Sequence, residues 1–585
     1  MAGPALAALL RVGTASAQVI DSLPRRADTA AARDSADAFQ RQQADILVRV
    51  PVMPRLAADG PRPAASRVVF TRDSIDWAGA ATVGDLLGRV PGVYLWRGGG
   101  IGRPELPNFA GRGGASIEYL LDGVPYLPLG PDSVSVDPAL LPLGLVERIE
   151  VERWPGQLRV SLHSRRHDRL AARSHILLGA GPRSLTMYQG AIERRFLSGF
   201  GFGGGAEYLK SPASTGQYQN TQIWGYTSFV RSERFGLELQ YLGATPDRDA
   251  FSEAGELGER HEGRRSDILA RAFFGRGGGR APRVDVVAGR SAFDSAGIDQ
   301  SVTQLGAALS LRSATWAVRA GAFRQSRWTS LDGNAALSWT PASLLTVAGE
   351  GAYRRHDGDR TSRWLGLRAG LSLPAGLSLS ASARRGQLVA APAVATSAEQ
   401  TLSEADGLVS WDLRRVSAFV GYSRTKSFAP PAFQPYSSIS VIAPSGRTNW
   451  LTIGGRVAPV SWFSVHGWVS DPRSGAPDGL PPKHYMASAT IRSKFLRRFP
   501  SGAFDLKLEL GVEGWDSGVL GRSADGAPVS VPSATFVRGM AQLQLQSFSL
   551  FIESRNMAGR AAGYVPGFRI PRYTGFFGVR WGFNN

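Results

Sequence analysis

The most constraining feature of this 585-residue chain is an alternation of apolar and polar side chains that recurs along most of its length. In "FDLKLELGVEGW" (504–515), Leu508 and Leu510 fall on one face of an extended strand, and Glu509 falls on the other. After about Leu170 this pattern returns in about 22 segments, separated by turns rich in Gly, Pro, Asp, Asn or Arg. This pattern predicts a very large sheet with one apolar face and one polar face in contact with water.

The number and length of the segments distinguish between β architectures. A soluble β-sandwich has roughly 7 to 9 strands, and the sequence lacks the repeat of roughly 40 to 50 residues that a propeller would show. Strands of about ten residues, rising roughly 3.3 Å each and tilted near 40°, span roughly 25 Å, the apolar band of an outer membrane. We therefore predict an all-β transmembrane β-barrel of about 22 antiparallel strands.

The polar face of the segments carries charges and glutamines, as in "MAQLQLQS", which suits a water-filled or plugged lumen better than a dry core. Aromatic residues near segment ends are expected in the interface girdles: Phe504, Trp224, Tyr226, Trp328, Trp462 and Trp468.

The net charge of +19 is carried almost entirely by arginine. A basic surface could serve nucleic acid, lipid phosphate or an acidic ligand, and dispersed, solvated arginines are the alternative. Because the arginines form no single basic run, no nucleic-acid partner is predicted. The chain has no cysteine, which excludes disulfides and Cys-based zinc sites.

The front of the chain divides into three parts. Residues 1–17 end in Ala15-Ser16-Ala17, a small-residue cleavage pattern, and are predicted to be a signal peptide. Residues 18–66 are rich in Ala, Arg, Asp and Pro and are predicted to be a flexible periplasmic arm. Residues 67–165 then read as a small α+β domain.

Within this domain "RVVFTRDSI", "IEYLLDGVPY" and "LVERIEVERW" read as strands. "TVGDLLGRVPGV" reads as a helix capped by Thr82 with Asp85 three residues on, and Pro91-Gly92 as its end. A wide barrel left empty would leak, and barrels of about 22 strands are plugged. We therefore expect this domain to be a plug within a barrel formed by residues 166–585.

These segments resemble the TonB-dependent outer-membrane receptors, from residue 67 to the end and in order. Five stretches carry the resemblance: "TVGDLLGRVPGVYLW" (82–96), "NFAGRGGASIEYLLDGVPY" (108–126), "LPLGLVERIEVERWPG" (141–156), "GYSRTKSFAPPAF" (421–433) and "ESRNMAGRAAGYVPGFRIPRYTGFFGVRWGF" (553–583).

The resemblance implies two sets of site residues. The plug motifs comprise Arg112, Gly113, Asp122, Gly123, Pro125, Glu147, Arg148, Glu150, Arg153, Pro155 and Gly156. The C-terminal barrel signal comprises Tyr573, Phe577, Val579, Trp581 and Phe583. In the family, arginines of the two plug motifs pair with glutamates of the barrel wall, so the resemblance implies an electrostatic latch at Arg112 and Arg153.

The sequence departs from the family pattern at the end of the plug. Trp154 separates Arg153 from Pro155-Gly156, and the Tyr-Gly stretch that normally follows is missing. "ILVRVPV" (46–52) is the best candidate for the segment that TonB would bind, with a chance apolar patch as the alternative. These departures bear on energised transport more than on the fold.

No catalytic constellation is present, so no enzymatic activity, cofactor or metal is predicted. "GRGGGR" (275–280) has no helical pattern after it and is interpreted as a turn. His163 and His167 have a metal-ligand spacing only if they lie on a helix, and the pattern here is extended.

The combined reading is a monomeric TonB-dependent receptor in the outer membrane of a Gram-negative-type bacterium. It would import a scarce solute such as a siderophore, vitamin or glycan, with TonB and outer-membrane lipid or lipopolysaccharide as partners. The alternative is a plugged barrel that serves as a surface-binding or structural protein without energised transport. An outer-membrane enzyme is the third possibility. The solute stays open, because surface loops carry its recognition.

Overall fold

The computed structural model describes residues 48–56, 67–130, 134–212, 217–249, 251–253, 256–258, 261–276, 281–426, 439–443, 446–572 and 574–584. The predicted signal peptide, most of the predicted arm, most of "GRGGGR" and Tyr573 lie outside these residues. Arg49–Asn585 forms one structural unit.

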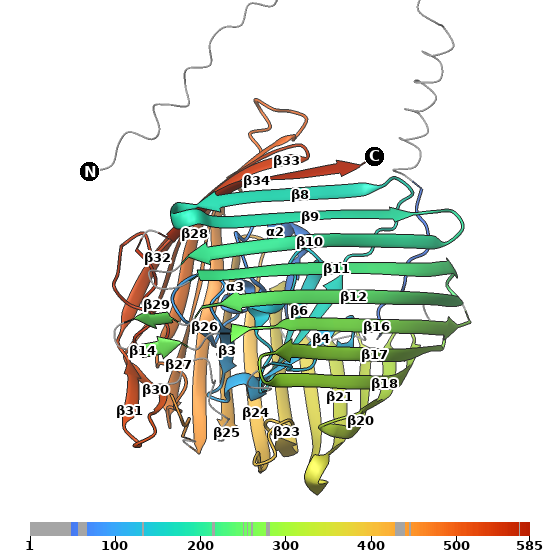
Figure 1. Cartoon of the computed structure of the whole chain (residues 1–585), viewed down its shortest axis with the longest axis horizontal. Helices are drawn as coiled ribbons and strands as arrows, with labels where there is room; N and C mark the ends of the chain where they lie inside the picture. The colour runs from blue at the N-terminus through green and yellow to red at the C-terminus, as the bar shows by residue number, and fades with distance from the viewer. Residues whose placement is uncertain are drawn as a thin grey trace, which may run out of the picture. The chain divides into compact units, whose positions relative to one another are not determined.

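Most of the described chain forms antiparallel strands that close into one ring, here called the wall (Figure 1). The wall strands are β8 (Arg173–Gly181), β9 (Leu185–Arg195), β10 (Phe200–Pro212), β11 (Gln217–Ser232), β12 (Phe235–Arg248), β15 (His261–Glu262), β16 (Arg264–Gly275), β17 (Arg283–Ser295), β18 (Ile298–Arg312), β19 (Trp316–Gln325), β20 (Thr329–Ala342), β21 (Leu345–His356), β22 (Thr361–Ser372), β23 (Leu377–Val389), β24 (Glu399–Asp412), β25 (Val416–Lys426), β26 (Arg447–Val460), β27 (Phe463–Ser474), β28 (His484–Ser493), β29 (Phe504–Trp515), β32 (Ala534–Leu545), β33 (Phe548–Arg555) and β34 (Thr574–Asn584). Two short hairpins lie outside the ring: β13 (Phe251–Glu253) with β14 (Glu256–Gly258), and β30 (Gly518–Arg522) with β31 (Pro528–Val531).

The ring closes where the last strand, β34, pairs with the first, β8, in the register Val579↔Leu178. The short β15 extends the pairing of β16 along β12. Counting these two as one, the described residues form a closed barrel of 22 strands, which confirms the predicted fold class.

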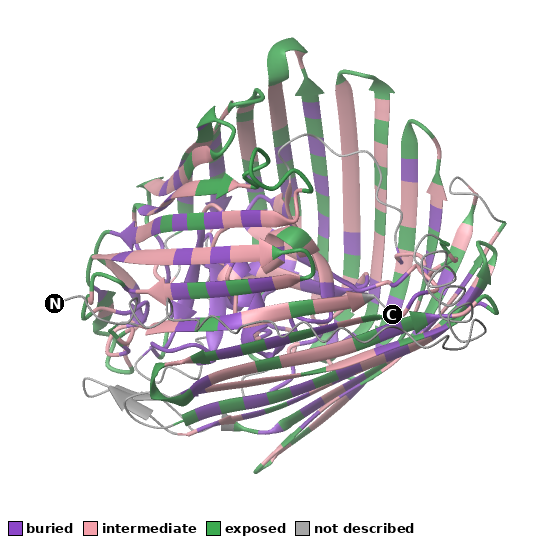
Figure 2. Ribbon diagram, turned by 90° about the horizontal axis from the view of Figure 1, so that it is seen from above, coloured by how far each residue is buried: buried purple, intermediate pink, exposed green. Residues whose placement is uncertain are grey.

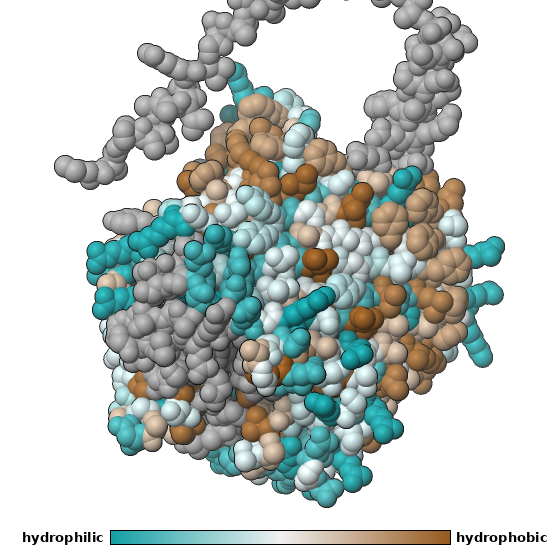
Figure 3. All heavy atoms as spheres, viewed as in Figure 1, coloured by the Kyte–Doolittle hydropathy of each residue, from teal (hydrophilic) through white to brown (hydrophobic). Residues whose placement is uncertain are grey.

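Burial along the wall strands is the reverse of that in a soluble protein. In β29, Leu508 and Leu510 are 40% and 56% exposed, while Asp505, Lys507 and Glu509 are less than 10% exposed. Figure 2 shows the same alternation of buried and exposed residues along other wall strands, and Figure 3 shows apolar side chains gathered on the outer face. The apolar face therefore lies outside and the charged face lines the lumen, as in an outer-membrane barrel.

The two rims of the barrel differ in their connections. At the near rim, where β8 begins and β34 ends, several connections have two residues, at 233–234, 343–344, 461–462 and 546–547. At the opposite, far rim the longest connections are 427–446, 516–533 and 556–573. Short turns on one side and long loops on the other are typical of outer-membrane barrels, whose long loops are extracellular.

Three of the predicted girdle residues are not in a girdle. Trp224, Tyr226 and Trp468 are less than 10% exposed and face the lumen. Trp224 and Tyr226 belong to the core cluster of the domain inside the barrel. The prediction was wrong because the strands extend beyond the segments read from the sequence. Trp224 and Tyr226 lie in the middle of β11 and Trp468 in the middle of β27, and all three are buried on the inward face. Trp462, which is 50% exposed at the near rim, has the expected exposure.

The domain that precedes the wall is the plug. Its elements are β1 (Arg67–Thr71), α2 (Arg72–Asp76), α3 (Val83–Leu87), β2 (Val93–Arg97), β3 (Glu105–Phe109), η1 (Gly113–Ser116), β4 (Ile117–Leu121), β5 (Val124–Pro125), η2 (Pro138–Leu140), β6 (Val146–Trp154) and β7 (Gln157–Ser164). Five strands form one sheet in the order β1-β6-β7-β4-β5, in which β4 and β7 are parallel, and β2 pairs with β3 in a separate hairpin.

The predicted plug helix is present and shorter than expected. Thr82 and Asp85 form a reciprocal capping box, and the helix α3 ends at Leu87, before the predicted Pro91-Gly92 stop. The plug core reaches the inner face of the wall, where Leu242 of β12 packs against it. Figure 1 accordingly shows α3 and β3 behind the front wall strands. In the described residues no helix has the length and apolarity to cross a bilayer.

The outward face makes a prediction about stability. Leu367 lies midway along β22 and is 55% exposed, so Leu367→Arg should destabilise the folded barrel by about 2–4 kcal/mol. Leu371→Arg, on the same face close to the near-rim end of the strand, is the matched control and should cost about 0–1 kcal/mol. Urea titration of the protein in lipid vesicles measures both, and equal costs would contradict the lipid-facing assignment.

Candidate functional site: the contact between plug and wall

The Asp122-Gly123 motif turns β4 into β5. Both residues have positive φ, 49° and 91°, as a two-residue type I′ turn requires. Buried Asp122 accepts hydrogen bonds from the amide and hydroxyl of Ser164 at 3.1 and 2.5 Å, and Arg166 lies 3.3 Å from it. A Cβ at Gly123 would lie 2.8 Å from that of Leu56. The motif thus joins the plug sheet to the segment that precedes it.

Arg112 brings together three segments that are far apart in the sequence. Its buried guanidinium donates to the carbonyl oxygens of Gly156 and Lys426, both at 3.0 Å, and forms an ion pair with Glu404. Glu404 is a fully buried, inward-facing residue of β24. The arrangement expected for a latch, a plug arginine on a wall glutamate, is therefore present at this position.

The Pro155-Gly156 motif forms the two-residue turn between β6 and β7. Gly156 has φ of +66°, a conformation that favours glycine. A Cβ there would lie 2.3 Å from Nη1 of Arg112, so only glycine leaves room for that side chain. The motifs at Arg112 and at Pro155-Gly156 are therefore in contact. The Arg112 side chain accounts for the glycine at position 156, and the Gly156 carbonyl accepts a hydrogen bond from Arg112.

Arg153 does not form the expected latch. No carboxylate of the described residues forms an ion pair with it, and its guanidinium lies 5.5 Å from the ring centre of Phe109. Instead Arg368 of β22 reaches in from the wall, 2.9 Å from Glu152 and 4.0 Å from the ring of Trp154. The inserted tryptophan provides the ring on which this wall arginine stacks, and the direction of the pairing is reversed.

Such reversed pairs, with a plug acid on a wall arginine, occur all around the plug. They are Asp85–Arg555 at 2.9 Å, Glu118–Arg354 at 2.6 Å, Asp137–Arg248 at 2.7 Å and Asp76–Arg580 at 3.4 Å. The sequence analysis missed them. Inward positions of the alternating strands were the available signal, but the partner of each arginine depends on the tertiary fold.

Glu147 and Glu150, two further residues of the plug motifs, belong to strand β6 of the plug. Glu150 is buried and gathers Arg67 at 2.9 Å, Arg148 at 2.8 Å and His163 at 3.5 Å. Glu147 lies at an irregularity of β6, where the register with β7 shifts.

Three further predicted residues make separate contacts. Gly113 donates its amide to the side chain of Asn108 at 2.9 Å, and the Pro125 carbonyl accepts from Gln304 of β18 at 3.1 Å. His167 contacts the carbonyl of Ala171 at 2.6 Å, so it does not share a partner with His163.

The C-terminal signal residues lie on the outer face of the closing strand β34. Phe577 and Trp581 are 60% and 48% exposed, and Val579 and Phe583 are half-buried on the same face. Trp581 contacts Phe583 at 4.6 Å between ring centres. These aromatic residues approach the near rim, where a girdle belongs.

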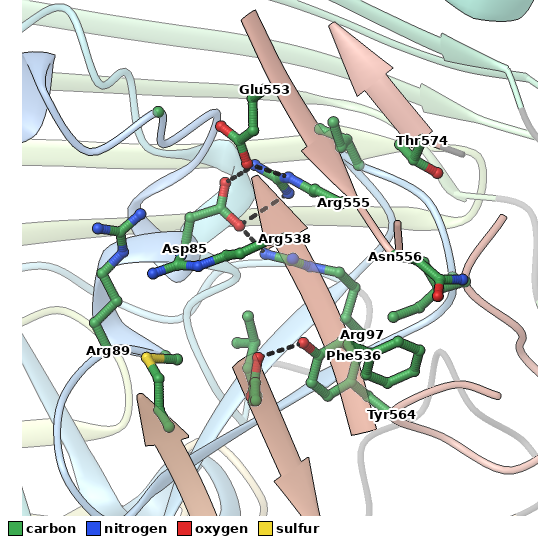
Figure 4. Close-up of a pocket in the computed structure, with 18 residues that line it drawn as sticks. Asp85, Arg89, Arg97, Phe536, Arg538, Glu553, Arg555, Asn556, Tyr564 and Thr574 are labelled. Carbon is green, nitrogen blue, oxygen red and sulfur yellow. Dashed lines mark hydrogen bonds and ion pairs between the residues drawn. The ribbon is translucent and has the colours of Figure 1, made fainter. Parts of the chain in front are cut away.

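A charged cavity of about 90 Å³ lies between the plug and β28–β33 (Figure 4). Arg555, the last residue of β33, donates to both carboxylate oxygens of Asp85 at 3.1 and 2.9 Å, and Arg97 donates to the same carboxylate at 2.7 Å. Glu553 binds the other side of Arg555 at 2.8 Å. Helix α3 is thus held to the wall by a bidentate ion pair with alternating charges around it.

Asp85 and Glu105 both form ion pairs with Arg97, and their electrostatics differ. Burial raises the pKa of Asp85, but the charges of Arg555 and Arg97 outweigh it and hold that pKa below its usual range. Burial raises the pKa of Glu105 to about 7 although Arg97 opposes the shift. Asp85 therefore stays ionised at neutral pH, whereas burial favours the protonated form of Glu105.

An apolar cluster seals the plug to the far rim on one side. Tyr94 of β2 donates to the Tyr564 carbonyl at 2.7 Å, and Trp96 donates to the Gly479 carbonyl at 2.9 Å. Both rings pack in a core cluster with residues of the connections 475–483, 516–533 and 556–573. The β2–β3 hairpin is thus covered by the long far-rim connections.

Elsewhere two cavities separate plug from wall. One, of about 160 Å³, lies at the far-rim ends of β19–β23, between Tyr126 of the plug and Trp328, Arg354 and His356 of the wall. The other, of about 370 Å³, lies towards the near rim between the plug strands β1 and β6 and the serine-rich inner face of β23–β25. The plug therefore does not pack uniformly against the wall.

The segment before the plug also contacts both parts. Met53 and Leu56 are 1% exposed. Three consecutive carbonyls each accept from an arginine of the plug–wall junction or the wall: Met53 from Arg166, Pro54 from Arg271 and Arg55 from Arg283. Of the candidate TonB-binding segment 46–52, Ile46 and Leu47 lie outside the described residues, and Val50 donates to the Asp168 carbonyl at 2.9 Å.

Comparison with known proteins agrees with this geometry. Residues 62–161 match the family described as TonB-dependent Receptor Plug Domain. A variant of the ferric enterobactin receptor PfeA of Pseudomonas aeruginosa has a similar structure, with a TM-score of 0.68 and 11% identity over 89% of this chain and 98% of that one.

Two other structures have the same fold. The siderophore receptor PirA of Acinetobacter baumannii has a TM-score of 0.68 and 9% identity over 89% of this chain and 98% of that one. The copper transporter OprC has a TM-score of 0.67 and 11% identity over 91% and 100%. These similar structures are receptors and transporters, and at such identities they establish the fold alone.

The ion pair at Arg112 makes a testable prediction. Arg112→Glu sets two carboxylates together in a buried site, so the plug should unfold at lower urea, with a loss of about 3–5 kcal/mol. Arg112→Glu with Glu404→Arg should recover much of that loss. Asp359→Asn is the control. It breaks an exposed ion pair, in which the side chains of Arg355 and Asp359 are 61% and 92% exposed, and should cost about 0–1 kcal/mol.

Tryptophan fluorescence of the detergent-purified protein follows plug and wall together, because Trp77, Trp96 and Trp154 lie in the plug and the other 11 of the 14 tryptophans lie in the barrel. The transition at lower urea, which the variant should shift, is assigned to the plug by its loss in variants in which each plug tryptophan is replaced by Phe. If Arg112→Glu left the urea midpoint unchanged, the ion pair would not hold the plug.

The fit of Gly156 to Arg112 makes a second prediction. Gly156→Ala should destabilise the plug through both its positive φ and the displacement of Arg112. Gly297→Ala is the matched control, because its φ is +82° and a Cβ there would meet nothing within 4 Å. The control should cost about 1–2 kcal/mol from backbone strain, and Gly156→Ala clearly more in the same urea titration. Equal costs would show that the contact with Arg112 is unimportant.

Proposed function

We propose that this chain, which carries the plug domain of TonB-dependent receptors within a barrel of their fold, imports a scarce solute across the outer membrane as a monomer. The observation that carries the proposal is the nature of the plug–wall contact. A covalently attached domain occupies the wet lumen, and ion pairs hold much of it to the wall. Pairs of this kind can be exchanged for hydration when the plug moves, so the closure is reversible.

Import through such a barrel requires external work. A solute bound with nanomolar affinity lies about 12 kcal/mol below the free state, and the outer membrane holds neither ATP nor an ion gradient. A TonB-type protein pulling on residues 18–66 would supply this work. Val50 is bonded to the Asp168 carbonyl, and Leu56 contacts both the wall and the Gly123 turn of the plug. A pull on the arm would therefore act first on the contact at Asp168 and then on the Asp122-Gly123 turn.

The solute would approach from the far rim. The connections 296–297 and 326–328 are short, and the cavity of about 160 Å³ lies at that end of the barrel. Its lining combines Tyr126 and Trp328 with His356 and with Arg354, which is paired with Glu118. The rings can stack on planar parts of a polar solute, and the polar groups can form hydrogen bonds with it. The similar structures include receptors for ferric enterobactin and a copper transporter, and a metal chelate is one member of the solute class proposed here.

A plugged barrel without energised transport is the second candidate. The observation in its favour is the altered end of the plug, where Arg368 forms an ion pair with Glu152 and stacks on the ring of the inserted Trp154. This wall arginine adds a contact that resists displacement of the plug. Such a protein would bind at the cell surface or support the membrane structurally.

Removal of residues 18–47 separates the two candidates. The importer predicts that the truncated chain still reaches the outer membrane and still binds its solute, but that uptake falls to the level of a deletion strain. A pull-down of the periplasmic domain of TonB with residues 18–66 should succeed. Failure of the pull-down, together with unchanged growth of the deletion strain on every scarce nutrient tested, would favour the structural candidate.

A further inference from the structure

The altered end of the plug leaves Arg153 without a carboxylate partner. Arg368 of the wall takes the position next to Glu152 and stacks on Trp154. Arg153 itself is partly buried, forms no ion pair among the described residues and lies 5.5 Å from the ring centre of Phe109. A cation that is taken out of water without a counter-charge is unfavourable, so this guanidinium is fitted to accept an anionic group from outside the protein.

Arg153 lines the cavity of about 370 Å³ that separates β1 and β6 of the plug from β23–β25 of the wall. This volume lies within the range of about 300–1,000 Å³ that is typical of small-molecule sites. The lining extends from Asp412 and Ser417, close to the near-rim ends of β24 and β25, inward to Arg153 and Asp406. A small solute would therefore reach the cavity from the near rim.

The wall side of the cavity carries an opposite charge, Asp406 of β24. Its carboxylate accepts a hydrogen bond from the hydroxyl of Ser382, and no cation of the described residues forms an ion pair with it. Burial lowers the pKa of Arg153, and the charge of Asp406 opposes that shift. Plug and wall thus present one positive and one negative group to the same space, and the two groups do not pair with one another.

The other charged groups of the lining already have partners or are solvated. Arg67 lies 2.9 Å from Glu150, and Arg368 lies 2.9 Å from Glu152. Asp412 is exposed at the end of its strand. The charges that an incoming ligand would meet unpaired are therefore those of Arg153 and Asp406.

The rest of the lining combines hydroxyl groups with apolar side chains. Alternate inward positions of β23 are serines, and apolar surface comes from the plug and from the next two wall strands. These residues are Ser378, Ser380 and Ser382, with Val151 of the plug and Leu408 and Phe419 of the wall. Such a lining suits a small molecule that has two charged ends and an apolar part.

We propose that this cavity binds a small zwitterion with an apolar side chain, of the amino-acid type. Its carboxylate would accept hydrogen bonds from Arg153, which offers two parallel N–H groups, and its ammonium group would donate to Asp406. Its side chain would lie against Leu408 and Phe419. The bound molecule would join plug to wall at the position where Arg153 lacks an ion pair. The proposal goes beyond import, because a barrel that transports nothing could hold the same ligand.

The absence of cysteine from the chain allows a direct test with leucine as the probe. Ser380→Cys places a single thiol in the cavity, and its rate of reaction with a small neutral thiol reagent is measured on the detergent-purified full-length protein. Leucine should slow this reaction. Leucinamide, which lacks the carboxylate, and N-acetylleucine, which lacks the ammonium group, should leave the rate unchanged.

Two variants in the Ser380→Cys protein test the two charges separately. Arg153→Gln and Asp406→Asn should each weaken the protection by leucine at least about tenfold, because each removes a charge-assisted hydrogen bond. Ser547→Cys, in an exposed near-rim turn outside the cavity, is the matched control and should react equally fast with and without leucine. Heat-dependent gel migration establishes that the variants are folded.

Urea titration gives a second measurement. Leucine should raise the urea midpoint of the plug in the unchanged protein and not in Arg153→Gln, because a ligand stabilises only the state that binds it. Equal protection by leucine and its two derivatives, protection that survives both variants, or an unchanged rate at the highest soluble concentration of leucine would overturn the proposal. No uptake is measured, so a failure of the import proposed above would leave these results unaffected.

Discussion

The pairing of β34 with β8 is the interaction on which the rest of the structure depends. In lipid, backbone amides and carbonyls have no water to bind, so a sheet with an unpaired edge is unstable there. Closure removes both edges at once and separates an apolar exterior from a polar lumen. Every further feature, including buried charges such as Glu404 and Asp85, is tolerable only because this closed wall shields a space that the lipid does not enter.

Inside that space charge pairing replaces apolar packing over much of the interface. A buried arginine or carboxylate is costly alone and tolerable when paired, and the plug and wall provide partners to one another, as Arg112 does for Glu404 and Arg555 for Asp85. Apolar contacts also join the two, in one cluster around Tyr94 and Trp96 beneath the long far-rim connections and in smaller clusters at Ile101 and Leu127. The import proposed above requires a domain that is stable at rest and leaves the wall when force is applied to one end.

The sequence predicted the fold well because alternation is a local property. The polar and apolar positions of β29, the capping box at Thr82 and the Asp122-Gly123 turn each follow from a few neighbouring residues. It predicted the site only in part. Arg112 was found through a motif, but Glu404 stands 292 positions later. The sequence around either residue does not indicate that the two will pair. The assignments of Trp224 and Tyr226 to a girdle failed because the strand begins earlier than the sequence pattern indicated, at Gln217, which places both residues in its middle and on its inward face.

By itself the sequence determined that the chain forms a barrel with an apolar outer face, preceded by a plug domain. Side-chain periodicity and turn residues are patterns of a few neighbouring positions, so they can be read from the sequence. Only the tertiary structure decided which charges meet. Wall strands close in a ring around the plug, and this brings Arg368 to Glu152 and Glu404 to Arg112. These pairings depend on strand register and on the curvature of the closed sheet, which are properties of the whole ring.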